Sequence, residues 1–246
     1  MKKKWSLKKK ILVIVPLLLL AVLVGAGVWY VNDYYHSDEI AATYLTTTDV
    51  VEVNENEWGY FFDSEGTEDA LIFYPGAKVE YTAYAPMMMM IAEKGIDVFL
   101  VKMPCNLAIL GQNKAQEIMD QYEYENWYLS GHSLGGAMAA DFTANHQDEV
   151  KGLVLMAAYP TKEITEKEIS VLSLYGSEDG VLNLDKVAQG KSLIAGSYLE
   201  ICMEGANHAG FGNYGEQKGD GIASMTSGLQ QQRTANEIAS WMSQNQ

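Results

Sequence analysis

Residues 131–135 read Gly-His-Ser-Leu-Gly, the G-x-S-x-G pattern of a nucleophile elbow. The apolar pair Tyr128 and Leu129 comes before this pattern and small residues at 137–140 follow it, so a strand at 126–130, a sharp turn and a helix are predicted. The turn strains the serine, and glycines are needed beside it where Cβ atoms would collide. The expected chemistry is attack by the Ser133 hydroxyl on a carbonyl carbon.

A serine nucleophile needs a base, and the chain has four histidines. His36 lies near the apolar N-terminal segment, and His132 lies inside the elbow beside the serine. His146 ends the helix predicted after the elbow, where a cation suits the helix dipole. His208 follows the last predicted strand, within a loop of small residues. His208 is therefore the predicted base.

The orienting acid is expected between the serine and the histidine in the chain, after the strand predicted at 171–174. Two acids compete there, Glu178 and Asp179. Asp179 is preferred because it lies one position further from the strand and has the shorter side chain. Glu178 is interpreted as a solvated loop acid and stays the alternative.

An oxyanion hole needs two N–H groups directed at the developing negative charge. One is expected from Leu134, directly after the serine, and the other from the loop at 74–78. Gly76 lets this loop turn with no side chain in the way, so the Ala77 amide is the predicted donor and the Gly76 amide is the alternative.

Three residues are expected to contact the substrate: Gly76 in this loop, and Phe211 and Tyr214, which closely follow the predicted base. For Asn106, a pocket position and a turn position stay open. The methionines at 87–90 are interpreted as helix core rather than as a metal site. No metal or organic cofactor is expected.

Charge limits the partners, because 32 acidic residues face only 17 basic ones, a net charge of −15. Six of the basic residues are lysines within the first ten positions, and without them the net charge is −21. Nucleic acid and anionic lipid headgroups would be repelled, which favours a small-molecule substrate. Cys105 and Cys202 are predicted to be free or buried thiols rather than a disulfide, because they end strands expected to lie far apart in the sheet.

The N-terminal lysines precede an uncharged apolar run at 11–31. About twenty apolar residues span a bilayer core, and the flanking lysines place that end in the cytoplasm. We therefore expect a signal anchor at 1–31, a polar stalk at 32–48 and an extracytoplasmic domain at 49–246. A cleaved signal peptide is the alternative, although the small residues at 25–27 make a poor cleavage site.

The domain shows apolar runs separated by helical segments, a pattern that predicts a mostly parallel sheet covered on both faces. An antiparallel hairpin is expected at 50–62, before the parallel strands. The parallel strands are expected at 70–74, 98–101, 127–129, 153–156, 171–174 and 198–203. Residues 157–170 leave no room for a helical cap, so an open site is expected.

Several segments together resemble a family of small bacterial α/β-hydrolases that is distantly similar to dienelactone hydrolases. The segments are 74–80, 102–104, 131–137, 207–209, 211–212, 214–215 and 219–221. The resemblance covers residues 40–242 and implies an α/β-hydrolase fold with a triad of Ser133, Asp179 and His208. Dienelactone hydrolases carry cysteine at the position of Ser133, so their substrate is not implied. Ala77 stands where related sequences often have a second glycine, which leaves the backbone donor intact.

We therefore expect a membrane-anchored serine hydrolase, a carboxylesterase that acts on small to medium esters through an acyl-enzyme. Acyl transfer to a cell-surface alcohol would use the same residues. A non-catalytic surface binding protein on a hydrolase scaffold is the alternative from another class. The oligomeric state stays open.

Overall fold

A computed structural model describes residues 6–65 and 68–245, which divide into two units, Met1–Tyr34 and Tyr35–Gln246. The described residues of the first unit form one helix, α1 (Leu7–Asn32), which is capped by Ser6, whose side chain accepts a hydrogen bond from the Lys9 amide. Its mean hydropathy reaches 3.0, so by length and composition it could cross a membrane.

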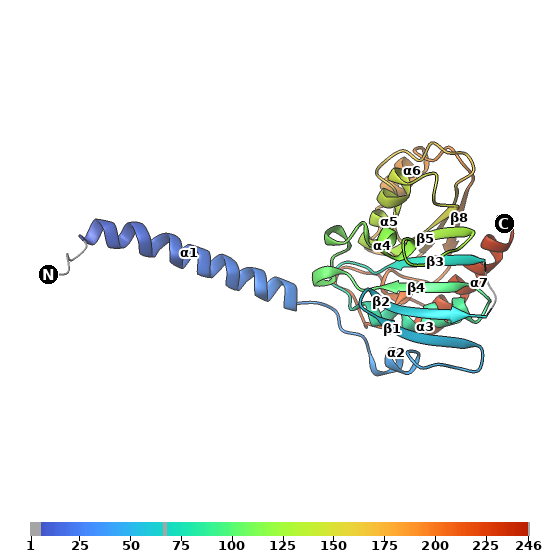
Figure 1. Cartoon of the computed structure of the whole chain (residues 1–246), viewed down its shortest axis with the longest axis horizontal. Helices are drawn as coiled ribbons and strands as arrows, with labels where there is room; N and C mark the ends of the chain where they lie inside the picture. Colours follow the sequence, from blue (N-terminus) through green and yellow to red (C-terminus); the bar gives the residue numbers. More distant parts are fainter. Residues whose placement is uncertain (1–5, 66–67, 246) are drawn as a thin grey trace. The chain divides into compact units, whose positions relative to one another are not determined.

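The second unit contains one eight-stranded sheet with the order β1-β2-β4-β3-β5-β6-β7-β8 (Figure 1). The strands are β1 (Val51–Asn56), β2 (Gly59–Ser64), β3 (Asp69–Tyr74), β4 (Asp97–Val101), β5 (Asn126–His132), β6 (Gly152–Met156), β7 (Ser170–Gly176) and β8 (Tyr198–Met203). β2 pairs antiparallel with β1 and β4, and the remaining neighbours pair in parallel. The predicted hairpin followed by six parallel strands is confirmed.

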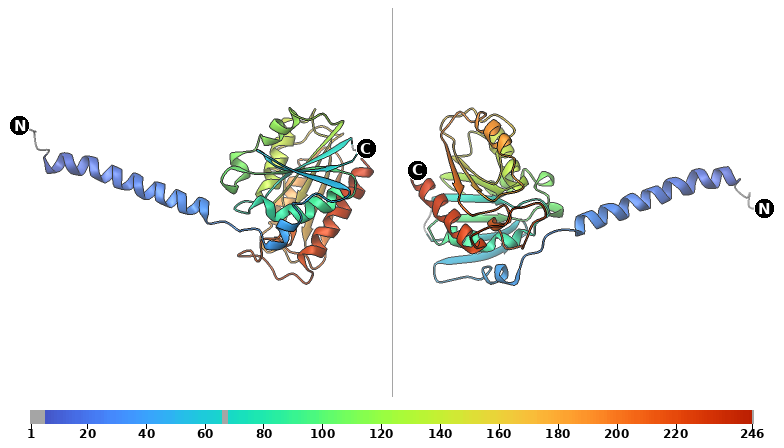
Figure 2. Two further views of the ribbon diagram at one scale, coloured as in Figure 1. Left: turned by 60° about the horizontal axis from the view of Figure 1, so that its bottom comes forward. Right: turned by 180° about the vertical axis from the view of Figure 1, so that it is seen from behind.

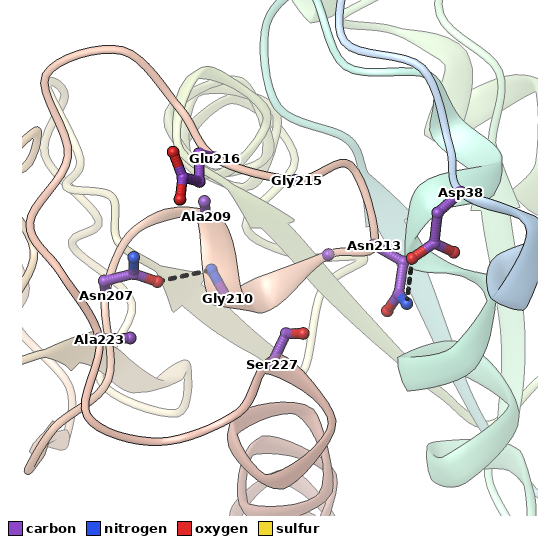
Figure 3. Close-up of a pocket in the computed structure, with 10 residues that line it drawn as sticks. Asp38, Asn207, Ala209, Gly210, Asn213, Gly215, Glu216, Ala223 and Ser227 are labelled. Carbon is purple, nitrogen blue, oxygen red and sulfur yellow. Dashed lines mark hydrogen bonds between the residues drawn. The ribbon is translucent and has the colours of Figure 1, made fainter.

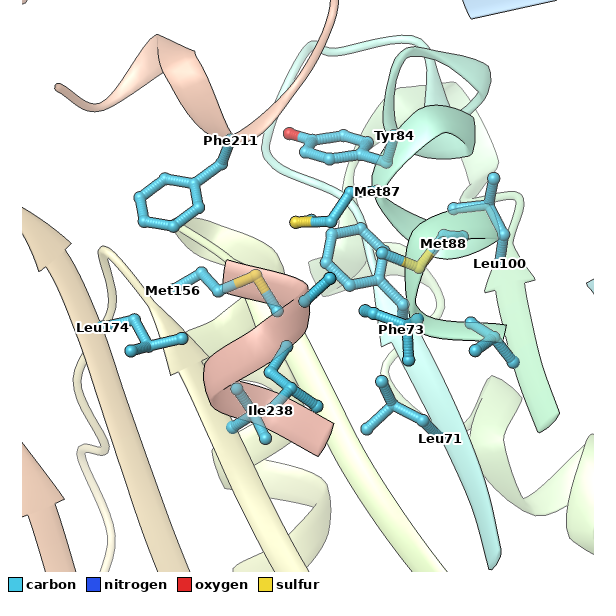
Figure 4. Close-up of a cluster of buried hydrophobic side chains, with 14 of the residues drawn as sticks. Leu71, Phe73, Tyr84, Met87, Met88, Leu100, Met156, Leu174, Phe211 and Ile238 are labelled. Carbon is cyan, nitrogen blue, oxygen red and sulfur yellow. The ribbon is translucent and has the colours of Figure 1, made fainter. Parts of the chain in front are cut away.

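Helices cover both faces of this sheet (Figure 2). They are α2 (Glu39–Thr43), α3 (Ala85–Ala92), α4 (Lys114–Met119), α5 (Leu134–Asn145), α6 (Leu184–Lys191) and α7 (Ser227–Ser243). Alternate residues of β3 face opposite sides, since Leu71 and Phe73 pack with α3 and α7, whereas Ala70 and Ile72 pack with α4 and α5. Figure 4 shows Met87 and Met88 of α3 within the apolar core between the sheet and the helices α3 and α7. The prediction that these methionines belong to a helix core is confirmed.

The predicted stalk is the part of the domain organisation that the structure revises. Residues from Tyr35 onward belong to the second unit, where Tyr35 forms a parallel bridge to Val79 and Ala41 of α2 is fully buried. The backbone bridge to Val79 and the buried Ala41 side chain hold this segment against the domain. The expected stalk at 32–48 therefore does not extend beyond residue 34.

Loops at the carboxyl ends of the parallel strands carry every predicted catalytic side chain. The connection between β6 and β7 contains no helix, as expected for a chain without a helical cap. Cys105 and Cys202 are both free and exposed, so the predicted free thiols are confirmed. In a parallel sheet this edge is where ligands bind.

Candidate active site

Ser133 stands between β5 and α5 in a conformation that few non-glycine residues adopt, with φ 53° and ψ −122°. Its backbone N–H donates to the Met156 carbonyl of the neighbouring strand, 2.9 Å away. This bond and the start of α5 fix the turn on both sides of the serine. The strained elbow predicted from the sequence is present.

The glycines of the elbow allow close backbone approach. A Cβ on Gly135 would collide with the carbonyl oxygen of Tyr74, and a Cβ on Gly131 would collide with the backbone of Gly135. The end of β3 therefore lies directly against the first turn of α5. This contact brings the loop at 74–78, here called the oxyanion loop because it carries the predicted Ala77 donor, next to the elbow.

His208 pairs with Asp179 across the loops that follow β8 and β7. Nδ1 of His208 lies 2.9 Å from Oδ2 of Asp179, and both side chains are only 2% exposed. Nε2 of His208 is buried and has no hydrogen-bond partner among the described residues. His208 and Ser133 line the same pocket, so this nitrogen is available for a group on the pocket side.

The other oxygen of Asp179 is also bonded, since Oδ1 accepts from the Val181 and Leu182 amides at 2.9 and 2.8 Å. Burial raises the pKa of Asp179, but the hydrogen bonds from His208 and from these two amides lower it by a larger amount. The net pKa lies below the usual aspartate value, and the group is a carboxylate at neutral pH. Glu178 is exposed and bonds Ser177 instead, so the structure places Asp179 beside the histidine.

Three successive amides follow β3, and their hydrogen bonds differ. The Gly76 amide donates to the Tyr84 hydroxyl at 3.1 Å, and the Lys78 amide donates to the Asn106 carbonyl at 2.8 Å. In the part of the chain that the structure describes, the Ala77 amide between them makes no hydrogen bond. Ala77 is thus the donor still available in this loop, and the alternative donor, Gly76, is already occupied.

Leu134 supplies a second available amide, because it is the first residue of α5 and the first N–H groups of a helix have no intrahelical acceptor. The helix dipole adds partial positive charge at this end. Asn106, with φ 53°, has the turn role, because its carbonyl accepts from the Lys78 amide.

Tyr84 and His132 form a chain of contacts that supports the oxyanion loop, and no sequence pattern indicated this role. The Tyr84 hydroxyl accepts from the Gly76 amide and lies 2.9 Å from Nδ1 of His132. Burial, followed by the nearby His208, lowers the pKa of His132 well below its usual value. A neutral His132 therefore lies under His208, with ring centroids 4.5 Å apart, and does not compete with it as a base.

Asp220 was part of the resemblance but had no predicted role. Its Oδ1 accepts from the amides of Gly180, His208 and Gly221 at 3.1, 3.2 and 2.8 Å, and its Oδ2 accepts from the Ala209 amide at 2.8 Å. Gly180 directly follows Asp179, so one carboxylate ties the loop of the acid to the loop of the histidine.

A pocket of about 370 Å³ opens beside Ser133 and His208. Its other lining residues are largely apolar and come from α5 and from the loops after β6 and β7: Leu134, Ala137, Met138, Ala157, Ala158, Tyr159, Thr161, Val181, Leu182 and Asn183. None of these was predicted as a pocket residue, and only Leu134 was predicted to belong to the site, as an oxyanion donor. The only sequence signal for the pocket residues outside α5 was their position in the chain, shortly after β6 or shortly after Asp179.

The predicted pocket residues Gly76, Phe211 and Tyr214 do not line this pocket. Phe211 is fully buried in the core because a short 3₁₀ helix, η4 (Ala209–Phe211), turns its ring inward against His132. Tyr214 is 6% exposed and packs on Tyr84. Gly76 is a buried residue of the loop at 74–78, and its amide donates to the Tyr84 hydroxyl. All three residues therefore lie outside this pocket.

The sequence profile of the alpha/beta hydrolase family matches residues 70–233, a range that includes Ser133, Asp179 and His208. The chain belongs to the alpha/beta hydrolase family. This membership confirms the family resemblance and supports a hydrolase. Comparison with the curated proteins gives no match.

Solved structures share the fold of this alpha/beta hydrolase at low sequence identity. MGS-MChE2, an alpha/beta hydrolase enzyme from the metagenome of lagoon sediments at Mar Chica, Morocco, has a TM-score of 0.58 and 15% identity, covering 80% of this chain and 99% of that one. Est1E from Butyrivibrio proteoclasticus has a TM-score of 0.55 and 10% identity, with 80% and 99% covered. A pyrethroid hydrolase from Sphingobium faniae JZ-2 has a TM-score of 0.51 and 15% identity, with 70% and 96% covered. These similarities show the fold.

Proposed function

We propose that this alpha/beta hydrolase is a membrane-anchored serine hydrolase that cleaves small to medium carboxylic esters outside the cytoplasm. The observation that carries the proposal is the buried pair of His208 and Asp179, whose remaining imidazole nitrogen lies unpartnered at the pocket that Ser133 lines. A base oriented by a carboxylate beside a strained serine is the arrangement that nucleophilic acyl transfer requires.

In the proposed reaction, Ser133 Oγ attacks the ester carbonyl carbon while Nε2 of His208 takes its proton. Asp179 keeps the Nδ1 proton in place and stabilises the imidazolium that forms. The alcohol then leaves with the proton from Nε2, and an acyl-enzyme stays on Ser133. Water, deprotonated by the same nitrogen, attacks this acyl group and releases the carboxylic acid.

The Ala77 and Leu134 amides are proposed to bind the oxyanion of both tetrahedral intermediates. Both N–H groups lack acceptors in the described chain, and neighbouring bonds hold the Ala77 peptide on either side. Preorganised donors of this kind contribute about 3 to 4 kcal/mol each to lowering the barrier.

The pocket supports an uncharged acyl group. None of its lining residues is Lys, Arg, Asp or Glu, and Met138, Leu182 and Val181 give it an apolar wall. Its volume of about 370 Å³ lies near the lower end of ligand pockets, which run from about 300 to 1,000 Å³. Small to medium acyl chains fit this size.

Membrane anchoring is supported by α1 and by the lysines that precede it in the sequence. A positively charged flank favours a cytoplasmic N-terminus, which would place the enzyme domain on the other side. Membrane fractionation of a C-terminally tagged chain, followed by protease treatment of sealed cells, tests this orientation. A tag protected in sealed cells, or a chain shortened in the soluble fraction, would contradict the proposed anchor.

The catalytic proposal is tested on the full-length chain in detergent, with fluorophosphonate labelling and hydrolysis of p-nitrophenyl esters from acetate to laurate. Ser133→Ala should abolish labelling, and His208→Ala should lower kcat by about 10⁴-fold. Adding primary alcohols during turnover would show acyl transfer, the second reaction open to the same residues, as an ester product.

Two matched variants control for general disruption. His146→Ala removes a histidine whose Nδ1 bonds Phe142 at the other end of α5, and it should keep wild-type activity. Glu178→Gln changes the acid beside Asp179 and should also be active, whereas Asp179→Asn should not. A folded wild-type chain that neither labels nor hydrolyses any ester would instead favour a binding protein on this scaffold.

A further inference from the structure

The segment at residues 35–38, here called the strap, contacts the loop that carries the Ala77 amide. The Tyr35 amide donates to the Lys78 carbonyl at 2.7 Å, and the Tyr35 carbonyl accepts from the Glu80 amide at 2.9 Å. These two bonds form the parallel bridge between Tyr35 and Val79. The strap thus pairs with the backbone directly after Ala77.

Side chains strengthen this pairing further along the strap. The Ser37 amide donates to Oε2 of Glu80 at 3.0 Å, and the Thr82 hydroxyl donates to the Ser37 hydroxyl at 3.0 Å. His36 lies 3.5 Å from the same carboxylate oxygen of Glu80. The oxyanion loop and the 3₁₀ helix that follows it, η1 (Tyr81–Tyr84), are therefore both hydrogen-bonded to the strap.

The strap also contacts the loop after His208. The Asp38 amide donates to the Asn213 carbonyl at 2.9 Å, and the Asn213 side-chain amide donates back to Asp38 at 3.0 Å (Figure 3). The Tyr35 hydroxyl accepts from the Lys218 amide at 3.2 Å, and the Tyr35 ring packs on Tyr214 with centroids 5.6 Å apart. One short segment therefore joins the oxyanion loop to the loop of the base.

The oxyanion loop needs such support because its conformation is strained. Lys78 has φ 57°, which a lysine seldom adopts. Its amide is held by the Asn106 carbonyl and its carbonyl by the Tyr35 amide. The second of these bonds holds the peptide between Lys78 and Val79, whose Val79 N–H donates to the Gly76 carbonyl at 3.3 Å. The Gly76 carbonyl shares its peptide with the Ala77 N–H, so without the Tyr35 bond the Ala77 N–H would change direction.

We propose that the strap is a positioning element of the active site, which fixes the Ala77 amide relative to His208 and thereby sets kcat. This inference rests on the proposed function, because it assigns the strap to the oxyanion hole of that reaction. Only Asp33 and Tyr34 separate the strap from α1 in the sequence. The chain that leaves the membrane helix is therefore part of the catalytic machinery rather than a passive linker.

The test inserts two glycines between Ser37 and Asp38 of the full-length chain, which separates the contacts between Asp38 and Asn213 from those that Tyr35 and Ser37 make with the oxyanion loop. The control inserts the same residues between Thr46 and Thr47, after α2, where the strap contacts stay intact. The strap insertion should lower kcat by about 10- to 100-fold while KM changes little, because misplacement near 1 Å costs about that much. The control insertion should leave kcat unchanged.

A milder pair of variants covers the case in which the strap insertion does not fold. Glu80→Ala removes the acceptor for the Ser37 amide, and Glu39→Ala, at an exposed position in α2, is its control. Glu80→Ala should lower kcat several-fold with unchanged KM, and Glu39→Ala should not. A fall in melting temperature with full kcat at low temperature would overturn the proposal, since the strap would then only stabilise the fold.

Hydrogen exchange of the peptide covering residues 75–80 gives a readout that does not depend on turnover. Faster exchange there in the strap insertion, with unchanged exchange in β5 and β6, supports the positioning role. Unchanged exchange at 75–80 would overturn it. If the wild-type chain neither labels nor hydrolyses esters, the proposed function fails, and the exchange data still decide whether the strap holds this loop.

Discussion

Asp220 offers the sharpest test of how the acid and base loops are held, through the substitution Asp220→Asn. In the wild-type chain its carboxylate accepts four backbone N–H groups, among them those of Gly180 and His208. An asparagine of the same shape has one carbonyl oxygen and one NH₂ group. With the oxygen facing the three donors on the Oδ1 side, the NH₂ group opposes the Ala209 amide.

The magnitude follows from this count. One charge-assisted hydrogen bond, worth about 1.5 to 3 kcal/mol, is replaced by two opposed donors, and the three remaining bonds lose their charged acceptor. We expect the free energy of unfolding to fall by about 2 to 3 kcal/mol. Because the opposed amide directly follows His208, the imidazole shifts relative to Ser133, and kcat should fall by about 10- to 100-fold.

The assay combines thermal unfolding with kcat and KM for p-nitrophenyl butyrate, and fluorophosphonate labelling reports the reactivity of the serine. Asp185→Asn is the matched control, since Asp185 is an exposed acid in the first turn of α6. A fall in stability with kcat unchanged would refute the positioning role of Asp220. Unchanged stability and unchanged kcat would refute the hydrogen-bond network itself.

Three further outcomes are expected. Tyr84→Phe removes the acceptor for the Gly76 amide and should lower kcat about 10-fold with little change in KM, measured by steady-state kinetics with Tyr81→Phe as the control. Met138→Phe fills part of the apolar pocket, so the ratio of kcat/KM for octanoate to that for acetate should fall. Burial raises the pKa of Asp97 to about 6, above its unfolded value of about 3.9, so the folded state loses stability as the pH rises between these values. Asp97→Asn cannot ionise, so its unfolding free energy relative to wild type should rise between about pH 4 and pH 6 in urea titrations.

The sheet and its catalytic edge were predictable because they depend on local signals. The runs at 70–74 and 153–156 are apolar without alternation, and both are buried parallel strands. The elbow was predictable for a similar reason, since its glycines are required by backbone contacts within a few residues. Asp179 and His208 followed from chain order and from the strands that precede them.

The pocket was not predictable in the same way, because its walls come from segments that meet only in the folded chain. Phe211 follows His208 closely, and closeness in sequence suggested a pocket wall, yet η4 directs its ring into the core. Val181 lies two residues after Asp179 in the chain and received no prediction, but it lines the pocket beside Leu182. Sequence spacing shows which residues are neighbours along a loop and not the direction in which that loop turns.

The supporting contacts hold the loops of the proposed active site in a domain whose connection between β6 and β7 contains no helix. Each loop is fixed by a hydrogen bond to another segment: the Tyr84 hydroxyl accepts from the Gly76 amide, the Tyr35 amide donates to the Lys78 carbonyl, and the Asp220 carboxylate accepts from the His208 amide. A cap domain would exclude water, but an open site must obtain its preorganisation from such bonds, because solvent can reach and reorient any donor that is not held. These bonding partners are spread over segments far apart in the chain, so loss of any one of them should lower the rate by releasing one loop.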